Sequence, residues 1–257
     1  METSPDPWIG ALRRSHDRLQ ALVEPLDVGQ LEQRSYASEW SIAQVLSHLG
    51  SGAEIFGLFL EAGLAGQDPP GRDAFGPIWN TWNAKDPQAQ AADGLRADEA
   101  TLERFESLDP EQKAGLRLHL FGMDLDITGV ARMRVSEHAV HTWDVAVALD
   151  PSATVAPDAV SLLIDTVGQL AARSAKPDGK ERRIRVFTTD PERHFLLETG
   201  EAVSLTESDG EGGLPALRLP AEAFVRLVYG RLGPHHTPAV EADGVDLDEL
   251  RQLFPGF

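Results

Sequence analysis

The residues best suited to chemistry lie in one segment of the chain, RVSEHAVHTWD. Glu137 and His141 stand four residues apart in it, so on a helix they share one face. A carboxylate and an imidazole one turn apart can hold a single metal ion. His48, in a separate helical segment, can supply a third ligand across a helical bundle, where such sites are commonly built. The spacing therefore predicts one divalent ion bound by His48, Glu137 and His141.

The donor set limits the identity of this ion. Three protein ligands leave at least one position open, which is typical of a catalytic site, whereas a structural site closes its shell. Two imidazoles and a carboxylate suit zinc best and also suit ferrous iron. His138 is a rival ligand because it precedes His141 by three residues, but it lies about 100° round the helix from Glu137. The alternative to a metal site is a solvated Glu137 and a hydrogen-bonded core His141.

Two neighbours of these residues are candidates for a catalytic role. Asp144 follows His141 by three residues and can orient its imidazole, as metal-bound histidines usually require. The alternative for Asp144 is a solvated place on the helix surface. Arg134 precedes Glu137 by one turn. The alternative to a catalytic role for Arg134 is an ordinary ion pair with Glu137, which contributes little to the stability of the helix if it is exposed.

Two tryptophans are candidates for binding a cofactor. Trp79 and Trp82 lie between residues 64 and 86, a stretch rich in Gly, Pro, Asp and Asn that predicts a long connection. We expect them to wall the pocket, with core packing as the alternative. Gly52 follows His48 by four residues, and we expect it to leave room beside the imidazole.

These residues need a helical framework, and the first 150 residues predict one. Apolar residues recur at the helical period in four segments. Ser41 and Gln44 have the spacing of a capping box at the start of the second segment, and Asp86 with Pro87 opens the third. The predicted helices cover residues 8–23, 41 to about 60, 87–107 and 124–149. Four helices with one long connection predict a four-helix bundle.

After residue 150 the pattern changes from helices to short strands. Four short segments rich in β-branched or apolar residues follow one another, namely RRIRVFTTD, RHFLLETG, EAVSLTES and LPALRLP. One helical segment precedes them, and two others, AEAFVRLVYGRL and DLDELRQLF, follow them. Clustered strands with flanking helices predict an α+β domain. The predicted fold class is therefore α+β in two domains, residues 1–152 and 153–257.

The composition of the 257 residues excludes several classes of function. A formal net charge of −18 disfavours nucleic acid and anionic lipid as partners. The N-terminus lacks the features of a secretory signal, and no run of about 18 apolar residues occurs, so we predict a cytoplasmic protein without membrane partners. Cysteine is absent, so no protein thiolate can act as nucleophile or ligand. Any thiol chemistry would need a thiol from outside the chain.

The segments EWSIAQVLSHL and ARMRVSEHAVHTWDV resemble the two metal-binding stretches of the mycothiol-dependent maleylpyruvate isomerase family. LPAEAFVRLVYGRLGP and VDLDELRQLFPGF resemble the C-terminal domain of that family. The resemblance implies a DinB-like four-helix bundle followed by an SCP2-like α+β domain. It implies zinc at His48, Glu137 and His141, and it matches the family's arginine to Arg134. It also implies mycothiol, a small thiol of actinobacteria, as co-substrate.

The combined prediction is a zinc-dependent and mycothiol-dependent enzyme that acts on a small electrophile through a metal-bound thiolate. Adding and then releasing the thiolate at a conjugated double bond would make it an isomerase; keeping the new bond would make it an S-transferase. Two alternatives remain open, an iron enzyme with a two-histidine-one-carboxylate site and a non-catalytic, metal-containing carrier. The expected partners are the thiol and the electrophile, and the chain is expected to be a monomer or a homodimer.

Overall fold

The computed structural model describes residues 4–37, 39–208 and 212–256. The chain divides into two compact units, Met1–Asp150 and Pro151–Phe257. The first is a helical bundle, and the second combines helices with a mixed sheet. This confirms the α+β fold class predicted from the sequence. No helix among the described residues is both long enough and apolar enough to cross a membrane.

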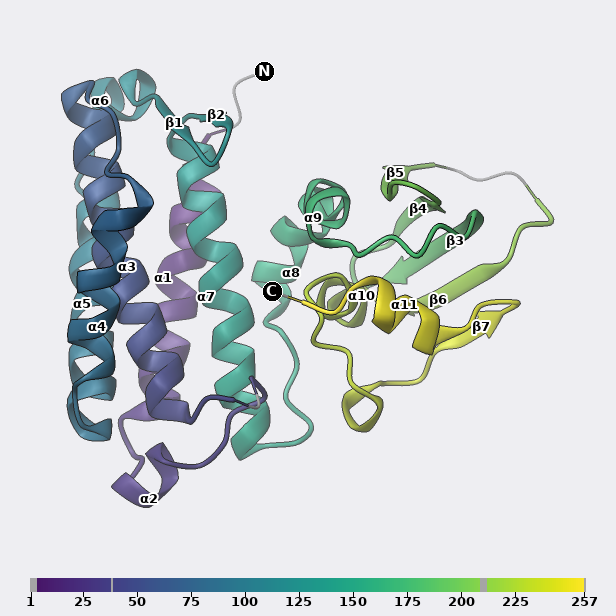
Figure 1. The fold of residues 1–257 in the computed structure, drawn as a ribbon, viewed down its shortest axis with the longest axis horizontal. Helices are drawn as coiled ribbons and strands as arrows, with labels where there is room; N and C mark the ends of the chain where they lie inside the picture. The colour runs from purple at the N-terminus through teal and green to yellow at the C-terminus, as the bar shows by residue number, and fades with distance from the viewer. Residues whose placement is uncertain (1–3, 38, 209–211, 257) are drawn as a thin grey trace. The chain divides into compact units, whose positions relative to one another are not determined.

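Four long helices run side by side in the first unit (Figure 1). They are α1 (Asp6–Val23), α3 (Ile42–Ala65), α5 (Pro87–Glu106) and α7 (Ile127–Leu149). Short elements connect them: α2 (Val28–Leu31), η1 (Arg72–Ala74), α4 (Phe75–Asn83), α6 (Pro110–Gly115) and a hairpin of β1 (Leu118–Leu120) and β2 (Met123–Leu125). The fourth predicted helix therefore begins three residues later than expected, because residues 123–125 form a strand.

Local sequence signals explain where the helices that matter here begin. Ser41 caps α3, with its hydroxyl 3.2 Å from the Gln44 amide nitrogen, and the Gln44 side chain accepts from the Ser41 amide at 2.9 Å. This confirms the predicted capping box. The Asp86 side chain caps α5 by accepting from the Ala89 amide at 2.8 Å, and Asp126 caps α7 by accepting from the Gly129 amide at 2.8 Å. Such caps typically contribute about 1 kcal/mol each.

The bundle is built from two helix pairs. α3 packs most extensively on α5, and α7 packs most extensively on α1. Two glycines allow α3 and α5 to approach closely: a Cβ atom on Gly94 would lie 2.6 Å from the Leu46 carbonyl oxygen, and one on Gly50 would lie 2.9 Å from the Gly94 Cα atom. Neither position therefore accepts a larger residue without separating the helices.

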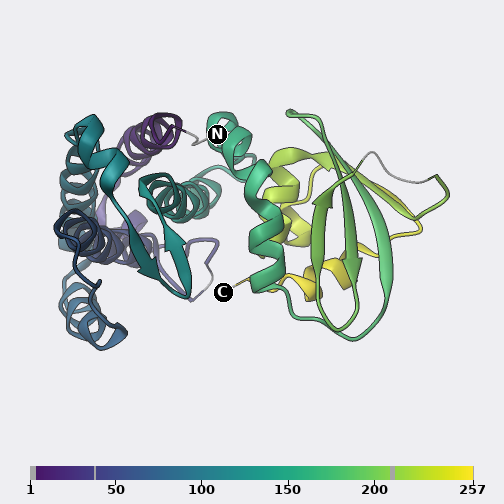
Figure 2. The same cartoon turned by 90° about the horizontal axis from the view of Figure 1, so that it is seen from above.

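The second unit contains one five-stranded sheet in the order β5-β4-β3-β6-β7. Its strands are β3 (Arg182–Thr189), β4 (Arg193–Thr199), β5 (Ser204–Glu207), β6 (Ala216–Pro220) and β7 (Glu241–Asp243), and only β3 and β6 pair in parallel. Its helices are α8 (Pro157–Leu163), η2 (Ile164–Thr166), α9 (Val167–Ser174), α10 (Ala221–Val228), η3 (Pro234–His236) and α11 (Leu247–Leu253). The helical layer covers one face of the sheet (Figure 2). The four predicted strands are confirmed; β7, which is short, polar and exposed, was not predicted.

Candidate metal centre

The structure brings the three predicted ligands together from two helices. His48 lies on α3, and Glu137 and His141 lie one turn apart on α7. The Nε2 atom of His48 is 3.2 Å from Oε2 of Glu137, and Nε2 of His141 is 3.7 Å from the same oxygen. His141 is buried, whereas the side chains of His48 and Glu137 remain 34% and 44% exposed. The three donor atoms therefore face one another at a site that small molecules can reach.

These separations fit a divalent ion. A tetrahedral ion bonded at about 2.0–2.1 Å separates its ligand atoms by about 3.3 Å. The two distances to the Glu137 carboxylate lie close to that value, and the imidazole rings of His48 and His141 meet edge to face with centroids 4.7 Å apart. Two neutral nitrogens and one carboxylate oxygen are donors that zinc and ferrous iron both accept.

Electrostatics keep these groups in the forms that can bind a metal. Partial burial alone would raise the pKa of Glu137, but the hydrogen bond to His48 and the nearby charges of His141 and Arg134 outweigh it and lower the pKa to about 2. Burial lowers the pKa of His48. The charges of His141 and Arg134 lower it further, and together these effects outweigh Glu137, which raises it. An ionised carboxylate and a neutral imidazole follow, and both can donate to a cation.

Asp144 orients one of the imidazoles. It is fully buried, and its Oδ2 atom lies 2.8 Å from Nδ1 of His141. Because the carboxylate accepts the proton on Nδ1, the lone pair of His141 is left on Nε2, which faces Glu137. The alternative of a solvated Asp144 is therefore wrong.

The aromatic residue beside the site is Trp40, which the sequence analysis missed. Its ring centroid lies 4.9 Å from that of His48 and 6.1 Å from that of His141. Trp82 instead fills the space over Gly50, and its indole nitrogen donates to Glu54 at 2.9 Å. Trp79 is 46% exposed and contacts the ring of Phe75. Among the described ring contacts of the two imidazoles, neither Trp79 nor Trp82 occurs.

The alternative interpretation of Arg134, an exposed ion pair with Glu137, is wrong. Its side chain is buried, pairs with Asp98 of α5, and donates from Nη2 to the carbonyl oxygen of Leu49 at 2.9 Å. A Cβ atom on Gly52 would lie 3.1 Å from Nη1 of Arg134. The expectation that Gly52 makes room for His48 is thus corrected: the space it leaves is taken by the guanidinium.

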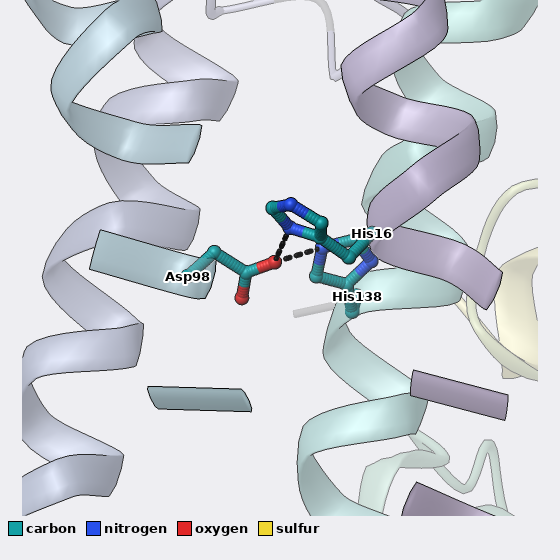
Figure 3. Close-up of side chains that lie close together, drawn as sticks. All are labelled: His16, Asp98 and His138. Atoms are coloured by element: carbon teal, nitrogen blue, oxygen red, sulfur yellow. Dashed lines mark hydrogen bonds and ion pairs between the residues drawn. The ribbon is translucent and has the colours of Figure 1, made fainter. Parts of the chain in front are cut away.

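His138, the rival ligand, belongs to a second buried group that we call the Asp98 cluster: His16, Asp98, Arg134 and His138. Oδ2 of Asp98 lies 2.7 Å from Nδ1 of His16 and 2.8 Å from Nε2 of His138 (Figure 3). The other nitrogen of His138 is 2.8 Å from the hydroxyl of Ser15. His138 is thus occupied away from Glu137. The sequence analysis assigned no role to His16 or to Asp98.

The Asp98 cluster could in principle hold a metal, since its donor atoms lie within 4.8 Å of one another. Its separations of 2.7 and 2.8 Å are, however, hydrogen-bond lengths, shorter than the spacing of about 3.3 Å around a tetrahedral ion. Burial would raise the pKa of Asp98, but the positive charges of His138 and Arg134 and the hydrogen bonds outweigh it and hold the pKa well below its usual value. Hydrogen bonds from the histidines therefore satisfy the Asp98 carboxylate without a metal ion.

His16 gives the bundle a pH-dependent stability. Its Nδ1 faces Asp98 and its Nε2 lies 2.9 Å from Glu99, so a protonated ring satisfies both carboxylates. Burial lowers the pKa of His16, but these two carboxylates outweigh burial and the opposing charge of Arg13, and the pKa is raised above its usual 6.5. A raised pKa stabilises the folded state fully below pH 6.5, and this stabilisation is lost as pH rises through the folded value.

We therefore expect the urea midpoint of the metal-free protein to fall as the pH rises above 6.5. All five tryptophans precede residue 150, so their fluorescence reports on the bundle alone. His48 and His138 have lowered pKa values, so the pH dependence that they add to the stability of the fold lies below pH 6.5. His16→Gln keeps a hydrogen-bond donor but cannot be charged, and its midpoint should vary less with pH. An equal slope in both proteins would contradict the assignment.

Comparison with known proteins places this chain in a family. A sequence profile described as the mycothiol maleylpyruvate isomerase N-terminal domain matches residues 12–146, more than half of the chain. No curated protein matches the sequence. A crystal structure of the mycothiol-dependent maleylpyruvate isomerase superposes with a TM-score of 0.69 at 12% identity over 94% of this chain and 93% of the other.

A crystal structure of a histidine-to-alanine mutant of that enzyme superposes with a TM-score of 0.67 at 11% identity, covering 90% of each chain. At such low identity the two structures show a shared fold, and the profile match shows the relationship. The family resemblance inferred from the sequence is confirmed: this chain belongs to the mycothiol maleylpyruvate isomerase N-terminal domain family.

Proposed function

We propose that this protein is an enzyme that binds one zinc ion through His48, Glu137 and His141 and uses it to activate a small thiol, mycothiol, for attack on a small electrophile. The observation that carries the proposal is the convergence of two imidazoles and a carboxylate at separations of 3.2 and 3.7 Å. Its family is named for a mycothiol-dependent isomerase. Three protein ligands leave a position open for the thiol.

The chain supplies the surroundings of this reaction but no nucleophile of its own. It contains no cysteine, so the attacking sulfur must come from the thiol substrate. When bound, a zinc ion would supply the positive charge that stabilises a thiolate and so lowers the pKa of the thiol. The partly exposed side chains of His48 and Glu137 leave room for a thiol to approach.

The neighbouring residues have distinct tasks in this proposal. Asp144 holds the Nδ1 proton of His141, so that the lone pair on Nε2 stays directed at the site. The Trp40 ring lies beside both imidazoles, closer to that of His48, and we propose that it helps to hold them in place. The roles that we propose for Arg134 and Asp144 are supporting ones, since both are buried and hydrogen-bonded to protein groups.

The proposed reaction class is isomerisation or S-transfer. In an isomerisation the thiolate adds to a conjugated double bond, a single bond rotates, and the thiolate leaves unchanged. In an S-transfer it attacks an electrophilic carbon and stays attached. Both begin with the same activated sulfur, so the metal site serves either. We propose in addition that the protein acts in the cytoplasm as a monomer or homodimer.

One second candidate function rests on the donor set itself. Two histidines and one carboxylate also form the ligand set of ferrous oxygenases. Iron reconstituted under air should then support oxidation of a substrate without any thiol. Metal analysis of the purified protein, combined with thiol consumption over a panel of electrophiles, separates this candidate from the zinc enzyme.

The proposal is tested by thiol binding to metal-loaded and metal-free protein. We expect mycothiol, or a simpler thiol at high concentration, to bind only the zinc-loaded form. Binding must release the thiol proton, which the buffer takes up. The binding enthalpies measured in two buffers should therefore differ by the difference between the ionisation enthalpies of the buffers. Equal thiol binding with and without zinc would rule out thiol activation by the ion and would favour the carrier function instead.

A further inference from the structure

The two helices that carry the candidate ligands are not each other's main packing partners. α3, with His48, packs chiefly on α5, and α7, with Glu137 and His141, packs chiefly on α1. The candidate metal site therefore spans the boundary between two helix pairs. The separation of its ligands depends on whatever holds these pairs at a fixed distance.

One buried carboxylate contacts both sides of this boundary. The side chain of Asp98, on α5, is 3% exposed and its Oδ2 atom meets His16 of α1 and His138 of α7 (Figure 3). Its Oδ1 atom pairs with Arg134 of α7.

Arg134 extends this link to the backbone beside the metal site. From the same Nη2 atom that faces Asp98, it donates to the carbonyl oxygen of Leu49 at 2.9 Å. Leu49 directly follows His48 on α3, and Arg134 precedes Glu137 by one turn on α7. A single guanidinium, held by Asp98, thus joins the backbone next to one ligand to the helix that carries the other two.

We propose that Asp98 is the positioning residue of the metal site: through Arg134 it fixes the spacing between α3 and α7 at which His48 meets Glu137 and His141. This inference rests on the proposed function, because it assumes that these three residues bind an ion. Asp98 itself touches neither the ion nor the substrate. Its effect is on the geometry that the ion encounters.

The test uses Co²⁺ as a spectroscopic probe with the full-length, metal-free protein. Asp98→Asn keeps the shape of the side chain but removes its charge and turns one acceptor into a donor. We expect Co²⁺ affinity, followed by quenching of tryptophan fluorescence, to fall about 10–100-fold, the usual effect of changing a residue that supports metal ligands. The visible absorption band of bound Co²⁺ should also change, because it reports ligand geometry, whereas far-UV circular dichroism should show a folded protein.

The matched control is Asp93→Asn. Asp93 lies on the same helix and also pairs with two cations, Lys85 at 2.7 Å and Arg96, but on the protein surface. We expect this variant to bind Co²⁺ with wild-type affinity and spectrum. If Asp98→Asn does not fold, Arg134→Lys takes its place: it keeps the charge facing Asp98, yet a lysine lacks the planar fork that serves Asp98 and Leu49 together. The same loss of affinity and spectral change are expected.

Two results would overturn the inference. A folded Asp98→Asn protein with wild-type Co²⁺ affinity and an unchanged band would show that Asp98 only stabilises the fold. Two Co²⁺ ions per wild-type chain, with one lost on Asp98→Asn, would show that the Asp98 cluster is itself a metal site. Failure of the wild-type protein to bind Co²⁺ would instead remove the proposed function, so the two ideas fail by different results.

Discussion

Replacing His141 by alanine is expected to remove the bound divalent ion and, with it, metal-dependent thiol binding. His141 is the buried member of the ligand set, and Asp144 holds its ring so that Nε2 faces Glu137 at 3.7 Å. Without it only His48 and Glu137 remain, and two ligands hold an ion far more weakly than three. Metal content after gel filtration, measured by mass spectrometry, should fall from about one ion per chain to near zero.

The decisive control for this prediction is the neighbouring histidine. His138 is a sequence-level rival for the same role, but it binds Asp98 and Ser15. His138→Gln retains a donor that can reach Asp98, and it should keep its metal and its thiol binding. Loss of the ion from His138→Gln together with its retention in His141→Ala would show that the ligand assignment is wrong by one turn of α7.

The placement of Glu137 and His141 on one helix face could be predicted from the sequence because it depends on helix periodicity alone. Glu137 and His141 share a face at any i, i+4 spacing, and the family resemblance matched His48 to the remaining ligand. The capping residue Ser41 similarly marks the start of α3 without reference to the rest of the fold. Signals of this kind depend on neighbouring residues alone, so they can be recognised without knowledge of the tertiary structure.

Trp40 could not be predicted because its position depends on a loop. The Ser35 amide donates to the Trp40 carbonyl oxygen at 2.9 Å, and Arg34 forms an isolated bridge with Ser41. These contacts hold Arg34 and Ser35 beside Trp40 and Ser41, and in this position the indole lies against the imidazoles. Nothing in the periodicity of the flanking helices indicates that turn, whereas Trp79 and Trp82 stood out only because their stretch of sequence was irregular.

Asp98 was hidden for a different reason. It is one acidic residue among many on α5, and its burial depends on the packing of α5 against the helices that carry His16 and His138. The partner of Arg134 was missed for the same reason: the sequence offered a catalytic role or, as the alternative, an ion pair with Glu137, but Arg134 pairs with Asp98 on another helix. Long-range pairing of buried charges is decided by helix packing, which composition and spacing do not encode.

Replacing Arg134 by methionine is expected to destabilise the bundle by about 3 kcal/mol, the lower end of the cost of removing one partner from a buried ion pair. Methionine fills much of the space, but Asp98 would lose its arginine partner and keep His16 and His138 as donors. The Leu49 carbonyl oxygen would lose the hydrogen bond from Arg134. Arg104→Met is the matched control, since Arg104 pairs with Glu61 on the surface, where such pairs contribute about 1 kcal/mol or less. Urea unfolding followed by tryptophan fluorescence measures the bundle in both variants. A similar small loss from both would mean that the buried position of Arg134 gives it no special weight, and the link through Asp98 to the metal site would lose its structural basis.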